Sequence, residues 1–151
     1  MDSNEINLLA IKLGIHSFLG VFAADQLDNL EEEQTGVLIC NTEPSYQSGR
    51  HWVGLCITKY SVIYFDSLNT NFFKSNHIKK MLNKFKKPFL KNNIQIQANN
   101  SDKCGIHSLV FCYIMSRKNS KKTFMRFLDS FSSHKVSQRE KLSLNYFLVI
   151  A

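Results

Sequence analysis

The segment "QANNSDKCGIHSLVFCYIMSR", residues 97–117, decides the fold of this chain. A polar loop rich in Asn and Asp leads directly into a Cys-Gly pair, and a mostly apolar stretch follows. From Cys104 to Arg117 the chain is apolar at too many positions for a surface helix, whose apolar residues would form a single stripe. We therefore expect a buried central helix that begins close to Cys104.

Three segments upstream have the length and the apolar, β-branched composition of buried strands. They cover residues 36–42, 51–58 and 61–67, and the last two form a hairpin. A short fourth strand is expected at residues 93–97. Helices are expected at residues 4–13, 25–33, 73–85, 122–131 and 137–149, the last opened by a capping box of Ser137 and Glu140. These elements predict one α+β domain over residues 1–151, with a small mixed or antiparallel sheet packed on the central helix and helices at both ends.

Composition narrows the class of protein. The chain has 151 residues, of which 44% are hydrophobic, so it can bury a sizeable core. No two of its four cysteines have the CxxC spacing, and four cysteines are too few for a disulfide scaffold in a chain of this length. No apolar run approaches the roughly 20 residues that a membrane helix needs. We expect a soluble, intracellular monomer in a reducing compartment, with no membrane partner.

Positive charge is concentrated in two segments. The net charge is +7, and the sequence pI is near 9.3. The lysines expected to contact nucleic acid are Lys79, Lys80, Lys84, Lys86, Lys87, Lys121 and Lys122. Such clusters favour a polyanion as partner, because phosphate contacts need no sequence-specific reading. Solvated helix faces explain the same pattern, and charge alone leaves both interpretations open.

Cys104 has the setting of a nucleophile if Ser101 or Asp102 caps the central helix. The unpaired N–H groups of the first turn and the helix dipole then stabilise a thiolate and lower the thiol pKa. Gly105 removes a side chain beside the sulfur, so that a substrate carbonyl can approach. A buried structural cysteine is the alternative, and the Cys-Gly pair alone does not exclude it.

Three other residues complete a catalytic set. A nucleophilic cysteine needs a base, an acceptor that orients the base, and donors for the oxyanion. His51 opens one strand of the hairpin and Asp66 closes the other, and in an antiparallel pair these ends are neighbours. Gln97 precedes the polar loop, where its amide and the Cys104 backbone N–H could reach the same carbonyl oxygen.

Two competing roles involve His107. It lies three residues after Cys104 and could serve as the base, although it would then act along one helix instead of across a cleft. Cys104, His107 and Cys112 could instead bind zinc, but structural zinc sites usually have four ligands and no fourth ligand is evident. We expect no metal.

The order "GRHWVGLCI…VIYFDSL…QANNSDKCG" resembles the cysteine proteases that include the adenovirus maturation protease (adenain) and the SUMO-specific Ulp-type proteases. The seven-residue step from Gln97 to Cys104 is similar to adenain, whereas Ulp-type enzymes usually have six. The segments "FLGVF", "CNT" and "REKLSLNYFL" also resemble adenain, so the similarity extends over nearly the whole chain.

This resemblance implies a papain-like fold and a set of roles. Cys104 would be the nucleophile, His51 the general base and acid, Asp66 the orienting acid and Gln97 an oxyanion-hole donor. Trp52, Gly105 and Asn41 would contact the substrate. Adenain has Glu where this chain has Asp, and "YFDSL" is closer to the Ulp type. The chain also lacks the cysteine to which a disulfide-linked peptide activator would attach.

The function implied is that of a viral endopeptidase. It would cut structural precursor proteins after small residues such as Gly during virion maturation, in the host nucleus and the virion. No cofactor is required for the chemistry, while DNA and a non-covalent activating peptide stay open as stimulators. Two rivals remain: a Ulp-like deSUMOylase or deubiquitinase, and a basic nucleic-acid-binding module without enzymatic activity.

Overall fold

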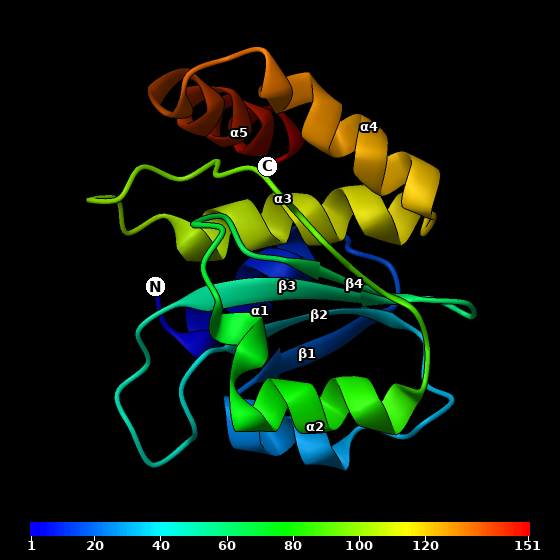
Figure 1. The fold of residues 1–151 in the computed structure, drawn as a ribbon. Helices are drawn as coiled ribbons and strands as arrows, with labels where there is room; N and C mark the ends of the chain where they lie inside the picture. Colours follow the sequence, from blue (N-terminus) through cyan, green and yellow to red (C-terminus); the bar gives the residue numbers. More distant parts are fainter.

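A five-stranded mixed sheet forms the centre of the protein (Figure 1). The computed structural model describes residues 1–151, apart from the side chain of Phe72. The strands lie in the order β1 (Phe18–Phe22), β2 (Gly36–Asn41), β3 (Trp52–Ile57), β4 (Val62–Phe65) and β5 (Phe89–Lys91). The inner pairs, β2 with β3 and β3 with β4, are antiparallel, and the two outer pairs are parallel. The expected α+β fold with a mixed sheet is confirmed.

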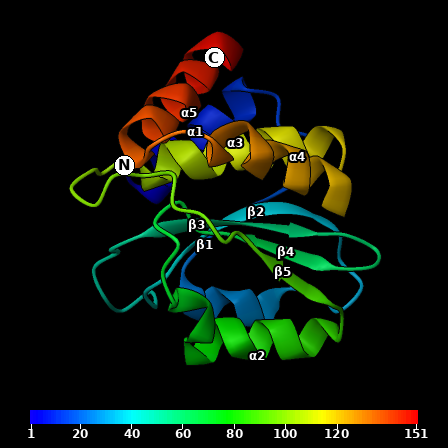
Figure 2. The same ribbon diagram turned by 45° about the horizontal axis from the view of Figure 1, so that its top comes forward.

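Helices cover both faces of the sheet (Figures 1 and 2). One face carries α1 (Ser3–Lys12), α3 (Cys104–Arg117), α4 (Lys121–Ser132) and α5 (Val136–Ile150). The other face carries α2 (Asn76–Phe85) and two short 3-10 helices, η1 (Ala24–Asn29) and η2 (Phe72–Lys74). Not one of the described helices is long and apolar enough to cross a bilayer.

Each face of the sheet has its own core. Strand β3 supplies both, because alternate side chains of a strand point to opposite faces. Leu55 and Ile57 pack towards α2, whereas Cys56 packs towards α3. Gly54 leaves room for α3, since a β-carbon at this position would lie 2.5 Å from a ring carbon of Phe111. The central helix is therefore buried directly on β3, as its apolar composition predicts.

One predicted strand is absent, and two of the observed strands, β1 and β5, were not predicted. Residues 93–97 form no strand, because the N–H groups of Ile96 and Gln97 both donate to the carbonyl of Ser67 instead of joining a ladder. The edge strand is β5, which begins directly after Pro88. Strand β1 was not expected, and its five residues are all half-buried. A strand without an alternating burial pattern gives little periodic signal.

Two helix predictions also need correction. The expected capping box at Ser137 is absent, because α5 begins at Val136 with Lys135 as its N-cap, and Glu140 lies beside His107 instead. The helix expected at residues 25–33 is the shorter 3-10 helix η1. The other expected helices are present to within a few residues.

Candidate active site

His51 and Asp66 meet at one end of the central hairpin. His51 directly precedes β3 and Asp66 directly follows β4, and the antiparallel register of these strands brings the two residues together. The Nε2 atom of His51 lies 2.6 Å from Oδ1 of Asp66. Both side chains are buried, with 4% and 0% of their surfaces exposed. The sheet thus forms the histidine–carboxylate pair that the sequence predicts.

Hydrogen bonds hold Asp66 in place on all sides. The Leu68 N–H donates to its Oδ1 at 2.9 Å, and the Thr70 N–H donates to its Oδ2 at 3.0 Å. The Thr70 hydroxyl donates to the same Oδ2 atom. Asn92 fixes the backbone by accepting from the Asp66 N–H at 2.9 Å and donating to its carbonyl at 2.7 Å. These contacts favour the ionised carboxylate and fix the direction from which it meets His51.

Cys104 is the first residue of α3, and its sulfur lies against the start of β3. The Trp52 N–H donates to Sγ at 3.5 Å, and the His51 ring forms a hydrogen bond with the same sulfur. Since Asp66 engages Nε2, the Nδ1 side of the ring is the one left for the thiol. The N-cap of α3 is Lys103, not Ser101 or Asp102, and it caps the helix with no side-chain hydrogen bond.

The electrostatics of these three residues favour an ion pair. Burial opposes ionisation of Cys104, but hydrogen bonds from His51 and the Trp52 N–H outweigh it and lower the thiol pKa. Burial also opposes protonation of His51, but its bonds to Asp66 and Cys104 raise the imidazole pKa to about 9. For Asp66 the bond to His51 overcomes burial, so its pKa is lowered. Thiolate, imidazolium and carboxylate are therefore the favoured charge states.

Gln97 is buried next to the loop that leads to Cys104. Its Oε1 accepts from the Ser67 hydroxyl at 2.6 Å, and its Nε2 donates to the Ser101 carbonyl at 2.7 Å. The two bonds fix which end of the amide carries the N–H groups, and one N–H of Nε2 stays free to donate elsewhere. Ser67 is fully buried and directly follows Asp66, so one short segment holds both the acid and the amide.

Three residues with supporting roles escaped the sequence analysis: Ser67, Thr70 and Asn92. Ser67 and Thr70 follow Asp66 closely in "DSLNT", where short hydroxyl side chains commonly bond to nearby backbone and carboxylate groups. Asn92 gave no such signal, because it directly follows β5 and meets Asp66 only through the parallel pairing of β5 with β4.

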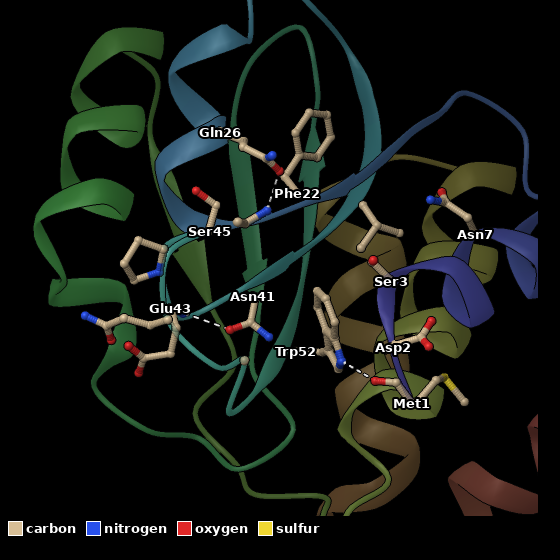
Figure 3. Close-up of a pocket in the computed structure, with 15 residues that line it drawn as sticks. Met1, Asp2, Ser3, Asn7, Phe22, Gln26, Asn41, Glu43, Ser45 and Trp52 are labelled. Carbon is tan, nitrogen blue, oxygen red and sulfur yellow. Dashed lines mark hydrogen bonds between the residues drawn. The ribbon is translucent and has the colours of Figure 1, made fainter.

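Trp52 and Asn41 line a pocket (Figure 3), and the backbone N–H of Trp52 also contacts the Cys104 sulfur. The pocket has a volume of about 550 Å³ and lies between the start of α1, the end of β1 and the loop from β2 to β3. The Trp52 indole N–H donates to the Met1 carbonyl at 3.0 Å, which fixes the ring at the rim of the pocket. Both residues thus line a pocket, and their contact with substrate stays a prediction.

Gly105 lies where Met1 and Trp52 come close to α3. A β-carbon at this position would lie 3.0 Å from the Met1 sulfur and 3.5 Å from a Trp52 ring carbon. Its small size therefore lets Met1 and Trp52 pack against α3, and its expected role in admitting the substrate carbonyl stays a prediction. Gly105 also lines a second pocket of about 500 Å³, on the other side of Met1.

His107 is not placed to act as the base. It is fully buried, and its Nδ1 lies 2.7 Å from the Ser143 hydroxyl on α5. Its Nε2 lies 3.5 Å from the Glu140 carboxylate. The four cysteines are free, and the described residues contain no group of three or more His, Cys, Asp or Glu side chains that could hold a metal ion.

The predicted nucleic-acid-binding lysines do not form one surface. Helices α2 and α4 lie on opposite faces of the sheet (Figure 2). Lys80 pairs with Asp28 at 3.1 Å, and Lys84 donates to the backbone carbonyls of Asp28 and Leu30. Lys87 donates to the Thr58 carbonyl at 2.7 Å. The exposed lysines of the set are Lys79, Lys80, Lys86, Lys121 and Lys122.

Comparisons with known proteins agree with this geometry at the level of the fold. No protein-family profile and no curated protein matches the sequence. Among solved structures, the ASFV pS273R protease matches with a TM-score of 0.60 and 15% identity, covering 99% of this chain and 66% of that one. A deletion variant of AvrA with IP6 and CoA matches with a TM-score of 0.52 and 17% identity, covering 97% and 68%.

The chain thus shares the fold of the ASFV pS273R protease, in agreement with the cysteine protease fold that the sequence resemblance predicts. It spans about two thirds of the length of each matched chain. At these identities the likeness concerns the fold and leaves the activity to be argued from the residues of the site.

Proposed function

We propose that this protein is a cysteine endopeptidase that uses Cys104, His51 and Asp66 as its catalytic triad. The observation that carries the proposal is the continuous chain of contacts from the sulfur through the imidazole to a buried carboxylate. A structural cysteine has no need of such a chain. A buried thiol without a charged partner has a raised pKa, as Cys112 does, whereas that of Cys104 is lowered.

The reaction begins with attack of the Cys104 thiolate on the carbonyl carbon of the scissile peptide bond. A C–S bond forms, and the carbonyl electron pair moves to the oxygen. Imidazolium at His51 then donates its proton to the amide nitrogen, the C–N bond breaks and the amine product leaves. Water attacks the thioester as His51 removes its proton, which releases the carboxylate product and restores the thiolate.

Donors for the oxyanion come from two places. The Cys104 backbone N–H lies in the first turn of α3, where helix N–H groups have no intrahelical acceptor. The second N–H of Gln97 Nε2 is the other proposed donor. Together they would stabilise the charge that develops on the carbonyl oxygen, which is usually the largest single contribution to such catalysis.

The substrate would be a protein with a small residue at the cleavage site. Met1 and Trp52 crowd the surface of α3 beside the nucleophile, which supports this preference. We further propose, from the resemblance to adenain and the viral origin of the matched ASFV protease, that viral structural precursors are cut during virion maturation in the host nucleus and the virion. DNA binding by the exposed lysines stays a proposal within this picture.

A direct test combines turnover with active-site labelling. Wild-type protein should cleave internally quenched peptides with a central Gly-Gly and should react with a thiol-directed probe at Cys104. Cys104→Ala should abolish both, while Cys112→Ala, which alters another buried thiol on α3, should retain them. Cleavage of a SUMO or ubiquitin conjugate but of no short peptide would favour the Ulp-like isopeptidase. Full peptide cleavage by Cys104→Ala would refute the proposal.

Acyl transfer is a second candidate. The matched AvrA structure contains CoA, which carries acyl groups. Cys104 could accept an acyl group from a CoA thioester and pass it to an amine instead of water, with the same triad. Incubation with radiolabelled acetyl-CoA and a lysine-containing protein would reveal this activity as Cys104-dependent labelling of the protein. If no label is transferred while peptides are cleaved, acyl transfer to an amine is refuted and the peptidase function is supported.

A further inference from the structure

The pocket beside Trp52 contains features that the triad does not use (Figure 3). It begins next to the nucleophile, because the backbone N–H of the same Trp52 donates to the Cys104 sulfur. Its volume of about 550 Å³ is large enough to accept side chains of a peptide. A peptide bound across Cys104 would therefore place residues from one side of the cleavage point in this pocket.

Asn41 points a hydrogen-bond donor into the pocket. The residue is 5% exposed, and its Oδ1 accepts from the Glu43 N–H at 2.9 Å. That bond fixes the amide, and its Nδ2 then has no hydrogen-bond partner among the described residues. Gly49 leaves the space for this nitrogen, since a β-carbon there would lie 2.5 Å from Nδ2. A nearly buried donor without a partner indicates a ligand acceptor, for which a substrate carbonyl is suited.

The charge of the pocket opposes that of the whole protein. Two carboxylates, Asp2 and Glu43, are among its lining residues, and the described lining includes no lysine or arginine, although the net charge of the chain is +7. Asp2 uses Oδ1 to accept from the Glu5 N–H at 2.9 Å. The Glu43 carboxylate forms no hydrogen bond or ion pair with any described residue. The α-amino group of Met1 faces Glu5, at 3.9 Å.

We propose that this pocket is a substrate subsite that binds a lysine or arginine side chain through Glu43 and a substrate backbone carbonyl through Asn41. The proposal rests on the proposed peptidase activity and adds a specificity to it. Asp2 reinforces the negative potential at the rim. A cationic side chain fits because the carboxylate of Glu43 has no competing partner and is partly shielded from water.

The test uses internally quenched peptides with a central Gly-Gly, in which each flanking position is varied among Lys, Arg, Gln and Glu. Wild-type protein should prefer Lys or Arg over Gln at one position by about 3- to 10-fold in kcat/KM, a range typical of one partly exposed ion pair. Glu43→Gln should remove this preference, so that the Lys, Arg and Gln peptides are cleaved with similar kcat/KM. Glu43→Lys should favour the Glu peptide. Glu32→Gln, an exposed change before β2, is the matched control.

Asn41 has a separate expected effect. Asn41→Ala should raise KM for every peptide in the set to a similar degree, because a backbone carbonyl is present in all of them. Glu43 loses an acceptor for its N–H in this variant, so thermal unfolding of Asn41→Ala must be measured beside it. A KM equal to that of the wild type in a folded Asn41→Ala protein would refute the role of its amide.

Binding to Cys104→Ala separates this proposal from the proposed function. Fluorescence anisotropy of the same peptides on that protein measures the subsite without turnover. Preferred binding of Lys peptides that Glu43→Gln abolishes would support the subsite even if the wild type cleaved nothing, in which case the peptidase proposal fails. Equal affinity for Lys and Gln peptides, or a Lys preference that survives Glu43→Gln, would refute the subsite.

Discussion

Replacing Ser67 with Ala should slow catalysis without touching the triad. The Ser67 hydroxyl donates to Gln97 Oε1 at 2.6 Å, and the serine is fully buried. Ser67→Ala leaves that oxygen without a donor, and an unsatisfied buried acceptor costs about 1–3 kcal/mol. The amide would relieve this cost by rotating, which withdraws its free N–H from the oxyanion. The bond from Nε2 to the Ser101 carbonyl, at 2.7 Å, resists the rotation.

The expected magnitude lies between two limits. Losing an oxyanion-hole donor outright costs about 10²–10³-fold in kcat, so Gln97→Ala sets the upper limit. A partial loss of orientation of about 1.4 kcal/mol corresponds to roughly a tenfold fall in kcat. KM should change little, because the oxyanion exists only in the transition state.

Steady-state cleavage of a Gly-Gly peptide by four proteins provides the assay: wild type, Ser67→Ala, Gln97→Ala and the double variant. If Ser67 acts through Gln97, the double variant should be no slower than Gln97→Ala. Ser143→Ala is the matched control, because it removes another buried hydroxyl, one that bonds His107 and neither Gln97 nor a residue of the triad. A wild-type kcat in Ser67→Ala, or losses that multiply in the double variant, would refute the reasoning.

Four further outcomes are expected. The pH profile of kcat/KM should be bell-shaped: activity rises as the Cys104 thiol ionises and falls above the His51 pKa of about 9, and an alkaline limb near 7 would contradict the ion pair. The same raised pKa implies that the stability contributed by His51 is present below 6.5 and is lost as pH rises through about 9, which urea denaturation at several pH values would measure. Gly54→Ala should destabilise the fold by about 1–3 kcal/mol, because its β-carbon would lie 2.5 Å from Phe111; unchanged denaturation would show that the ring moves freely. Lys121→Glu combined with Lys122→Glu should weaken salt-sensitive DNA binding, measured by fluorescence anisotropy. An equal loss of DNA binding from Lys84→Ala alone would contradict the observation that Lys84 is held by the carbonyls of Asp28 and Leu30.

The positions of the proposed catalytic residues were predictable because each follows from a local rule. His51 opens one apolar strand and Asp66 ends the next, so hairpin geometry alone makes them neighbours. Cys104 follows a polar loop and opens an apolar helix, the pattern of a thiol at a helix N-terminus. The buried segments were also clear, because strands covered on both faces are apolar throughout.

The remaining features depend on contacts between distant segments. Asn92 meets Asp66 only because β5 pairs with β4. Residues 93–97 do not form the expected strand because two of their N–H groups donate to the Ser67 carbonyl. Lys84 was expected to contact nucleic acid, yet its ammonium group donates to backbone carbonyls at the end of η1. No periodicity or motif in the sequence encodes such pairings before the tertiary structure is known.

The contact between the Trp52 indole and the Met1 carbonyl affects how the protein should be prepared. An affinity tag fused ahead of Met1 would extend from the boundary between the two pockets and could enter the pocket beside Trp52 as a tethered peptide. Such a fusion would compete with any added peptide and lower the measured affinity. A purification handle attached after the exposed Ala151 avoids this interference, and comparing the two fusions would reveal how closely the first residues border the path of the substrate.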